Sequence, residues 1–117
     1  MKKIVSLFFI LFTSLYGQDF FQVEINPTGV SQLVIFQNSI SGLEMGDEVG
    51  VFDSSGLLNS GDCLSQYGEI LVGSFVWEGA QVASSSIGSV DNCAFGGFQL
   101  PGWVSGNSVV VKVYRNG

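Results

Sequence analysis

The chain has 117 residues, of which 46% are hydrophobic and only 12% are charged, and it contains no histidine. This length suits a single domain, since a domain usually takes about 100–150 residues. The missing histidine excludes the Ser-His-Asp triad, the Cys-His pair and the two-histidine zinc helix of metalloproteases. We therefore expect a small protein that is not an enzyme.

The N-terminus has the three-part layout of a secretory signal peptide. A Met-Lys-Lys start precedes an apolar run from Ile4 to Leu15, and the small residue Gly17 stands before the predicted cleavage site. The run holds about 12 residues, whereas a membrane-spanning helix needs roughly 20. We expect residues 1–17 to be removed on export. Residues 18–117 then form one domain outside the cell or at its surface, with the periplasm as the alternative, either complete or as the first part of a longer protein.

Removal of the leader makes the protein more acidic. Lys112 and Arg115 remain as the basic residues against ten acidic ones, so the net charge changes from −6 to −8. Two cations cannot neutralise a row of phosphates, and we expect neither nucleic acid nor an anionic membrane surface as a partner. Other surface proteins or an extracellular glycan are the expected partners, and the mature chain is not expected to insert into a membrane.

Cys63 and Cys93 are the two cysteines of the chain. In an exported protein this even number predicts one disulfide that closes a loop of about 30 residues. Two buried free thiols and a thiolate metal site are the alternatives. Two sulfurs without histidine make only half of a zinc site, so the disulfide is the preferred interpretation.

Short apolar runs with period-two alternation follow one another after the leader. Residues 20–25 alternate, and residues 32–37 are apolar on both faces, which is typical of a central strand that is covered on both sides. Residues 48–53 form a third predicted strand, which Ser54–Gly56 should end as a turn. The remaining predicted strands are residues 69–77, the Ser-rich residues 81–87 at a sheet edge, and residues 108–114.

These elements predict an all-β fold. About 6–8 short strands, separated by Gly, Ser and Asn turns, are typical of an antiparallel β-sandwich of the Ig-like or jelly-roll-like kind. No segment offers the helices of 10–15 residues that a parallel α/β fold requires.

The stretch Gly46–Asp53 has two interpretations. In the structural one, Gly46 and Gly50 allow positive φ or close backbone approach, and Asp47 accepts hydrogen bonds from turn amides. In the functional one, loop carboxylates bind calcium, which prefers oxygen ligands. No EF-hand spacing is present, so we favour the structural interpretation. The candidate calcium ligands are Asp47, Glu48, Asp53, Asp62 and Asp91.

The order of motifs resembles a repeat-type extracellular β-domain of secreted and surface proteins from bacteria with type IX secretion. The resemblance covers roughly residues 42–115. Its most specific parts are Gly46-Asp47-Glu48-Val49-Gly50-Val51-Phe52 and the later Trp77-Glu78-Gly79. It implies an extracellular location and a β fold rather than an activity.

The aromatic residues divide between core and loops. Trp77 ends a strongly apolar strand and is expected in the core, whereas Trp103, Tyr67 and Phe95 lie in predicted loops and could stack on a sugar ring.

Our functional hypothesis is a non-catalytic, exported interaction or structural module. One alternative is a carbohydrate-binding module with structural calcium. The other is a subunit of an extracellular filament or layer, joined through exposed strand edges.

Overall fold

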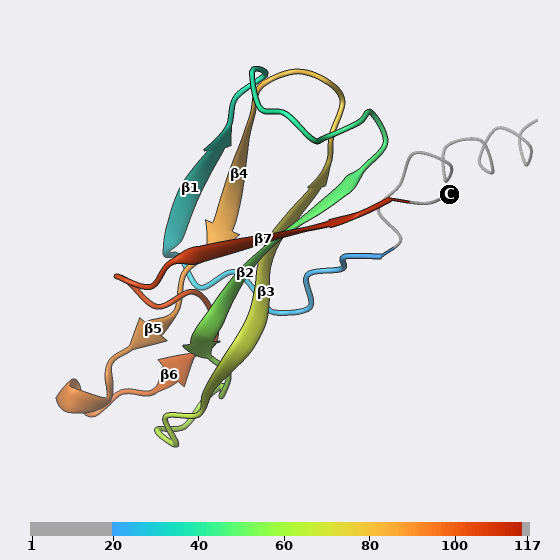
Figure 1. Cartoon of the computed structure of the whole chain (residues 1–117). Helices are drawn as coiled ribbons and strands as arrows, with labels where there is room; N and C mark the ends of the chain where they lie inside the picture. Colours follow the sequence, from blue (N-terminus) through green and yellow to red (C-terminus); the bar gives the residue numbers. More distant parts are fainter. Residues whose placement is uncertain (1–19, 116–117) are drawn as a thin grey trace, which may run out of the picture.

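The computed structural model describes residues 20–115. Its strands, shown in Figure 1, are β1 (Ser31–Phe36), β2 (Glu48–Leu57), β3 (Tyr67–Val76), β4 (Val82–Ile87), β5 (Val90–Asp91), β6 (Gln99–Leu100) and β7 (Val109–Tyr114). The 3-10 turn η1 (Cys93–Phe95) separates β5 from β6. All strand pairs are antiparallel, which confirms the predicted fold class. Within residues 20–115 no helix has the length and apolar character needed to cross a membrane.

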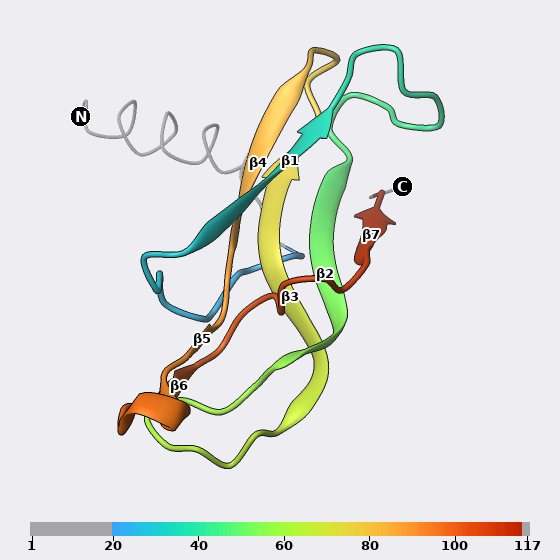
Figure 2. The same cartoon turned by 90° about the vertical axis from the view of Figure 1, so that its left-hand side faces the viewer.

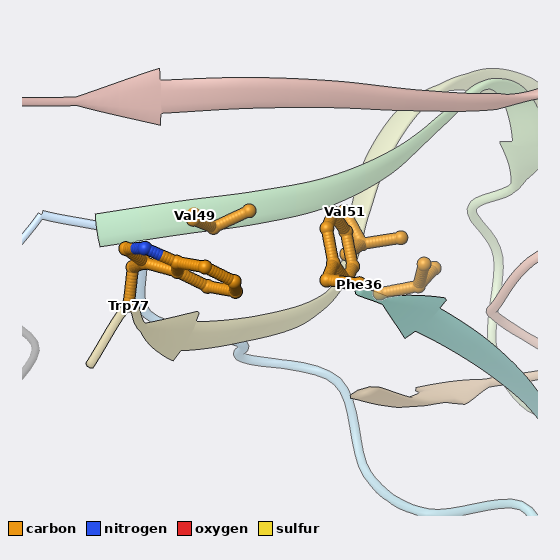
Figure 3. Packing of buried hydrophobic residues seen from close by; sticks show 5 residues of the cluster. Phe36, Val49, Val51 and Trp77 are labelled. Atoms are coloured by element: carbon orange, nitrogen blue, oxygen red, sulfur yellow. The ribbon is translucent and has the colours of Figure 1, made fainter. Parts of the chain in front are cut away.

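Five of the strands form two layers of a small sandwich, which Figure 2 shows from the side, and β5 and β6 form a separate two-stranded sheet. One layer is the pair β1–β4, and the other has the order β3–β2–β7. Phe36 of β1, Val49 and Val51 of β2, Val72 of β3 and the following Trp77 are buried in one core cluster (Figure 3). The prediction of Trp77 as a core residue is therefore confirmed.

Residues 20–25 do not form the predicted strand. The backbone N–H groups of Phe20 and Phe21 donate instead to Oε1 of Glu48, over 2.8 and 3.1 Å. The Phe20 ring also stacks on Tyr114, with ring centroids 4.0 Å apart. The Glu48 carboxylate thus accepts hydrogen bonds from amides that would otherwise pair with a neighbouring strand. Aromatic contacts hold the rest of the segment in place.

The Ser54–Gly56 turn is also a wrong prediction, since β2 continues through it to Leu57. The pairing of β2 with β3 shifts register between Asp53 and Gly56. At this point the N–H of Ser55 donates to Oδ1 of Asp53 over 2.9 Å. The turn-forming residues therefore make an irregularity within a long strand rather than a chain reversal.

Residues 32–36 of the predicted segment do lie in a strand, but β1 is not the central, doubly covered strand that we predicted. It pairs only with β4, in a two-stranded sheet. Leu33 and Ile35 on its outer face are 58% and 50% exposed, while Phe36 on its inner face is buried. The pair also leaves β4 with a single neighbour, as predicted for the Ser-rich segment.

Candidate functional site

A disulfide joins Cys63 to Cys93, with 6.1 Å between their Cα atoms, as predicted. It links the loop after β2 to the turn between β5 and β6, at the lower end of the molecule in Figure 1. We call residues 58–66 and 92–98 the disulfide tip. Sequence positions far apart are thus fixed side by side at one end of the sandwich.

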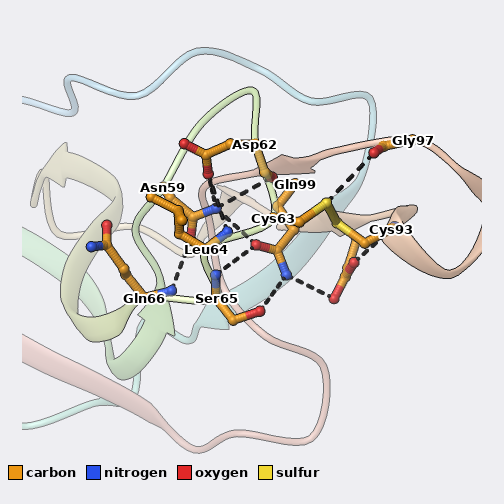
Figure 4. Close-up of a disulfide and its surroundings, with 10 residues drawn as sticks. Asn59, Asp62, Cys63, Leu64, Ser65, Gln66, Cys93, Gly97 and Gln99 are labelled. Carbon is orange, nitrogen blue, oxygen red and sulfur yellow. Dashed lines mark hydrogen bonds between the residues drawn. A yellow bond between two sulfur atoms is a disulfide. The ribbon is translucent and has the colours of Figure 1, made fainter.

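The buried side chain of Gln99 lies between the two halves of the disulfide tip and bonds to residues on both sides (Figure 4). Its Oε1 accepts hydrogen bonds from Nδ2 of Asn59 over 2.7 Å and from the N–H of Ser65 over 3.0 Å. Its Nε2 donates to Oγ of Ser65 and to Oδ2 of Asp91, each over 3.0 Å. All polar groups of this amide are engaged, so the network holds both halves of the tip together.

Asp62 and Asp91 serve this same network. Oδ1 of Asp62 accepts from Nδ2 of Asn59 over 2.7 Å. Asp91 accepts from the Gln99 side chain and from the N–H of Cys93, and these donors lower the pKa of the Asp91 carboxyl. Both carboxylates are thus hydrogen-bond acceptors that organise loops.

Large apolar side chains on the disulfide tip point into solvent. Phe95, the last residue of η1, is 89% exposed, and Leu64, next to Cys63, is 64% exposed. Phe98 is exposed as well. Water solvates such side chains poorly, and exposed apolar groups gathered in one region mark interaction sites. The tip therefore presents apolar side chains on a cross-linked, hydrogen-bonded base.

The three aromatic residues predicted as a sugar-binding platform have different surroundings. Tyr67 is exposed but is the first residue of β3, so its predicted place in a loop is wrong. Phe95 is exposed, whereas Trp103 is half-buried and packs against the core cluster. Its Nε1 donates to the carbonyl of Asn107 over 3.2 Å. Within residues 20–115 no ring contact joins Trp103 to Tyr67 or Phe95. Trp103 is therefore part of the packed sandwich, whereas Tyr67 and Phe95 lie on the surface.

Asp47 is buried and forms a two-pronged ion pair with Arg115. Nε of Arg115 donates to Oδ1 over 2.7 Å, and Nη2 donates to Oδ2 over 2.6 Å. Oδ2 also accepts from the N–H of Glu44 over 2.7 Å, so the predicted role of Asp47 as a turn acceptor is present. The Arg115 hydrogen bonds are the largest cause that lowers the pKa of Asp47, against the raising effect of burial.

Asp53 is fully buried beneath the loop that leads into β7. Its Oδ2 accepts from the N–H of Val104 over 2.8 Å, and both its oxygens accept from Nδ2 of Asn107 over 3.0 Å. This carboxylate therefore fixes the loop 104–107 to β2.

The candidate calcium ligands do not converge on one site. Asp47 faces Arg115, Glu48 holds the amides of residues 20 and 21, and Asp53 holds the loop before β7. Within the part of the chain that the structure describes, no three acidic or cysteine side chains are placed to bind a metal ion. The carboxylates instead bind amides and one guanidinium.

Two hollows on the surface have a carboxylate in their lining. One, of about 320 Å³, lies between residues 24–28 and the segments around Leu58 and Leu100. The other, of about 380 Å³, lies beside Trp77 and Met45. Each is lined by a single carboxylate, Glu24 in the first and Glu78 in the second. Neither holds the pair of carboxylates that glycoside hydrolysis requires.

Two important residues escaped sequence reasoning. Arg115 pairs with Asp47 across 68 positions, so no local pattern in the sequence indicates this ion pair. Gln99 is not indicated by the sequence either, since glutamine is usually a surface residue and its partners come from two separate segments, the loop 58–66 and β5.

Comparison of the chain with protein-family models, with curated proteins and with solved structures finds no match.

Proposed function

We propose that this chain is an exported, non-catalytic interaction module that works outside the cell or at the bacterial cell surface. The observation that carries the proposal is the disulfide tip with Phe95, 89% exposed, on its cross-linked base. A disulfide suits an oxidising compartment, and the sequence begins with the layout of a secretory leader.

The disulfide tip is the proposed contact surface. A binding surface benefits from being rigid before it meets its partner, because less conformational freedom is then lost on association. The Cys63–Cys93 bond and the Gln99 network supply that rigidity, and the exposed Phe95, Phe98 and Leu64 supply apolar area. The expected partner is another surface protein or a glycan with an apolar ring face.

Binding to intact cells of the source organism tests this proposal. Fluorescently labelled wild-type protein should bind, and Phe95→Ser should reduce the bound fraction by about tenfold, as loss of a central aromatic contact usually does. Met45→Ser is the matched control, because Met45 is also highly exposed but lies outside the disulfide tip. Equal binding by the wild type and Phe95→Ser would contradict the proposed contact surface.

A glycan array separates the two kinds of partner. Binding to an arrayed glycan that Phe95→Ser or Tyr67→Ser abolishes would favour the carbohydrate-binding alternative. Binding to cells that survives removal of surface glycans would favour a protein partner.

A further inference from the structure

β1 is an edge strand without the features that usually protect one. Natural edge strands are shielded by charges, prolines or bulges. No charged residue occurs between Ile25 and Leu43, β1 has no proline, and its pairing with β4 has no irregularity. The partner strand β4 lies in another uncharged stretch, from Gly79 to Val90. The β1–β4 layer is thus a neutral part of a strongly acidic protein.

Specific backbone groups of β1 face this free edge. The N–H of Gly88 donates to the carbonyl of Val30 over 2.8 Å, directly before β1 begins. Bonded and non-bonded positions alternate along an antiparallel pair, so the even-numbered residues of β1 bond toward β4. The groups that face the free edge belong to Ser31, Leu33 and Ile35.

One local hydrogen bond exists at this edge. The side chain of Gln32 donates to the neighbouring Leu33 carbonyl over 3.3 Å, at an exposed position. An incoming strand can displace such a contact at little cost, because the glutamine amide then returns to water.

An uncovered apolar strip lies on β7, in the opposite layer. Val111 of β7 pairs with Val51, and Val113 pairs with Val49. Opposed residues of an antiparallel pair share a face, and Val49 and Val51 are fully buried between the layers. Val111 and Val113 point to that same side, yet they are 44% and 45% exposed. The β1–β4 layer has only two strands, one fewer than the layer it faces.

We propose that β1 pairs with β1 of a second copy of this chain, antiparallel and about a two-fold axis. The contact creates a four-stranded layer in the order β4–β1–β1–β4. It extends each β1–β4 layer toward the uncovered valines of β7. Leu33 and Ile35 of the two copies become cross-strand neighbours on the outer face, which explains a strand that is apolar on both faces.

A second copy fits this edge better than a charged partner. The whole chain has a net charge of −6, so two copies repel each other wherever their carboxylates meet. Contact through β1 avoids that repulsion, since neither β1 nor β4 carries a charge. Every molecule also contains both the free edge of β1 and the exposed valines of β7. A two-fold axis therefore lets each copy pair its β1 and cover the valines of the other copy in the same contact.

Hydrogen exchange at increasing protein concentration tests the proposal most specifically. The full chain, after export with its own leader, should change from monomer to dimer in analytical ultracentrifugation. The amides of Leu33 and Ile35 should then exchange about tenfold more slowly or slower still, because they gain partners only in the dimer. The amides of Val34 and Phe36 bond to β4 and should be protected in both states.

Ile35→Pro tests the same edge by mutation. The change removes one N–H from the free edge and leaves the bonds to β4 in place. The variant should remain monomeric at concentrations where the wild type is a dimer. If circular dichroism shows that it fails to fold, Leu33→Lys replaces it, since this exposed side chain would set like charges beside each other in the dimer. Phe95→Ser is the control and should dimerise as the wild type does.

Three results would overturn the proposal. The wild type could stay monomeric at its highest soluble concentration. It could dimerise without slower exchange at Leu33 and Ile35, which would assign the contact to another surface. A folded Ile35→Pro or Leu33→Lys variant could dimerise as well as the wild type. None of these results affects the test of the disulfide tip, which uses different residues.

Discussion

Asp47 couples the stability of the sandwich to pH. Hydrogen bonds from Arg115 and from the amide of Glu44 hold the pKa of this carboxyl below its ordinary value of 3.8, although burial acts in the opposite direction. A carboxylate with a lowered pKa in the folded state stabilises the fold above the pKa of the unfolded chain. That stabilisation is lost as the pH falls through the folded-state pKa.

Asp47→Asn should therefore lower the melting temperature at neutral pH. The difference from the wild type should shrink as the pH falls below 3.8 and through the lower pKa of the folded-state carboxyl, because the wild-type side chain then also loses its charge. Thermal unfolding followed by circular dichroism over this range measures the difference.

Glu69→Gln is the control for this pH series. It removes the exposed Glu69–Lys112 pair, which should contribute only about 0–1 kcal/mol, so its effect should stay small at every pH. A difference between Asp47→Asn and the wild type that stays constant from neutral to acid pH would contradict the role of the Arg115 pair.

Residue-level prediction succeeded where partners are close in sequence and failed where they are distant. The acceptor role of Asp47 toward its own loop followed from the Gly-Asp turn pattern. Its pairing with Arg115 spans 68 positions, and no local pattern could indicate it. The same holds for Gln99, which bonds to Asn59 across 40 positions.

At the scale of elements, the segment 101–103 ties the two layers together. The N–H of Leu57 donates to the carbonyl of Gly102 over 3.0 Å, and the N–H of Gly102 donates back to Leu57 over 3.1 Å. On its other side Gly102 passes very close to the end of β4. A Cβ at this position would lie 2.5 Å from the carbonyl carbon of Gly88 and 2.6 Å from the nitrogen of Ser89.

Gly102→Ala should consequently destabilise the protein by about 1–3 kcal/mol or more, since backbone atoms must move to make room. Urea denaturation measures this loss. Gly68→Ala is the matched control, because the added methyl group would meet only the end of the exposed Leu58 side chain, at 3.0 Å. Equal stability of Gly102→Ala and Gly68→Ala would contradict the close contact between Gly102 and the backbone of Gly88 and Ser89.

The strand pattern predicted most of the elements but not their neighbours. Five of the predicted segments correspond to β1, β2, β3, β4 and β7, because alternation and β-branched residues are local properties. Residues 20–25 have the same alternation, yet a carboxylate and aromatic rings hold them instead of a strand. The strands β5 and β6 have two residues each, which is too short for a recognisable alternation of apolar and polar residues. Their position depends on the disulfide and on the Gln99 hydrogen bonds.

At the scale of the whole molecule, the disulfide closes a loop with a sequence separation of 30 residues. In the chain-entropy model such a loop contributes about 3–4 kcal/mol. The double variant Cys63→Ser/Cys93→Ser should lose stability of that order in urea denaturation. The loss should be largest in the disulfide tip, where hydrogen exchange of residues 92–98 should become faster. A variant as stable as the wild type would contradict a structural role for the bond.

We propose that this domain functions outside the cytoplasm with its disulfide formed. Non-reducing mass spectrometry of the protein, expressed with its own leader in the source organism, tests this proposal. We predict an extracellular or surface-bound chain that begins at Gln18 and lacks two hydrogens relative to its reduced form. A chain that stays in the cytoplasm, retains residues 1–17 and carries two free thiols would contradict the claim.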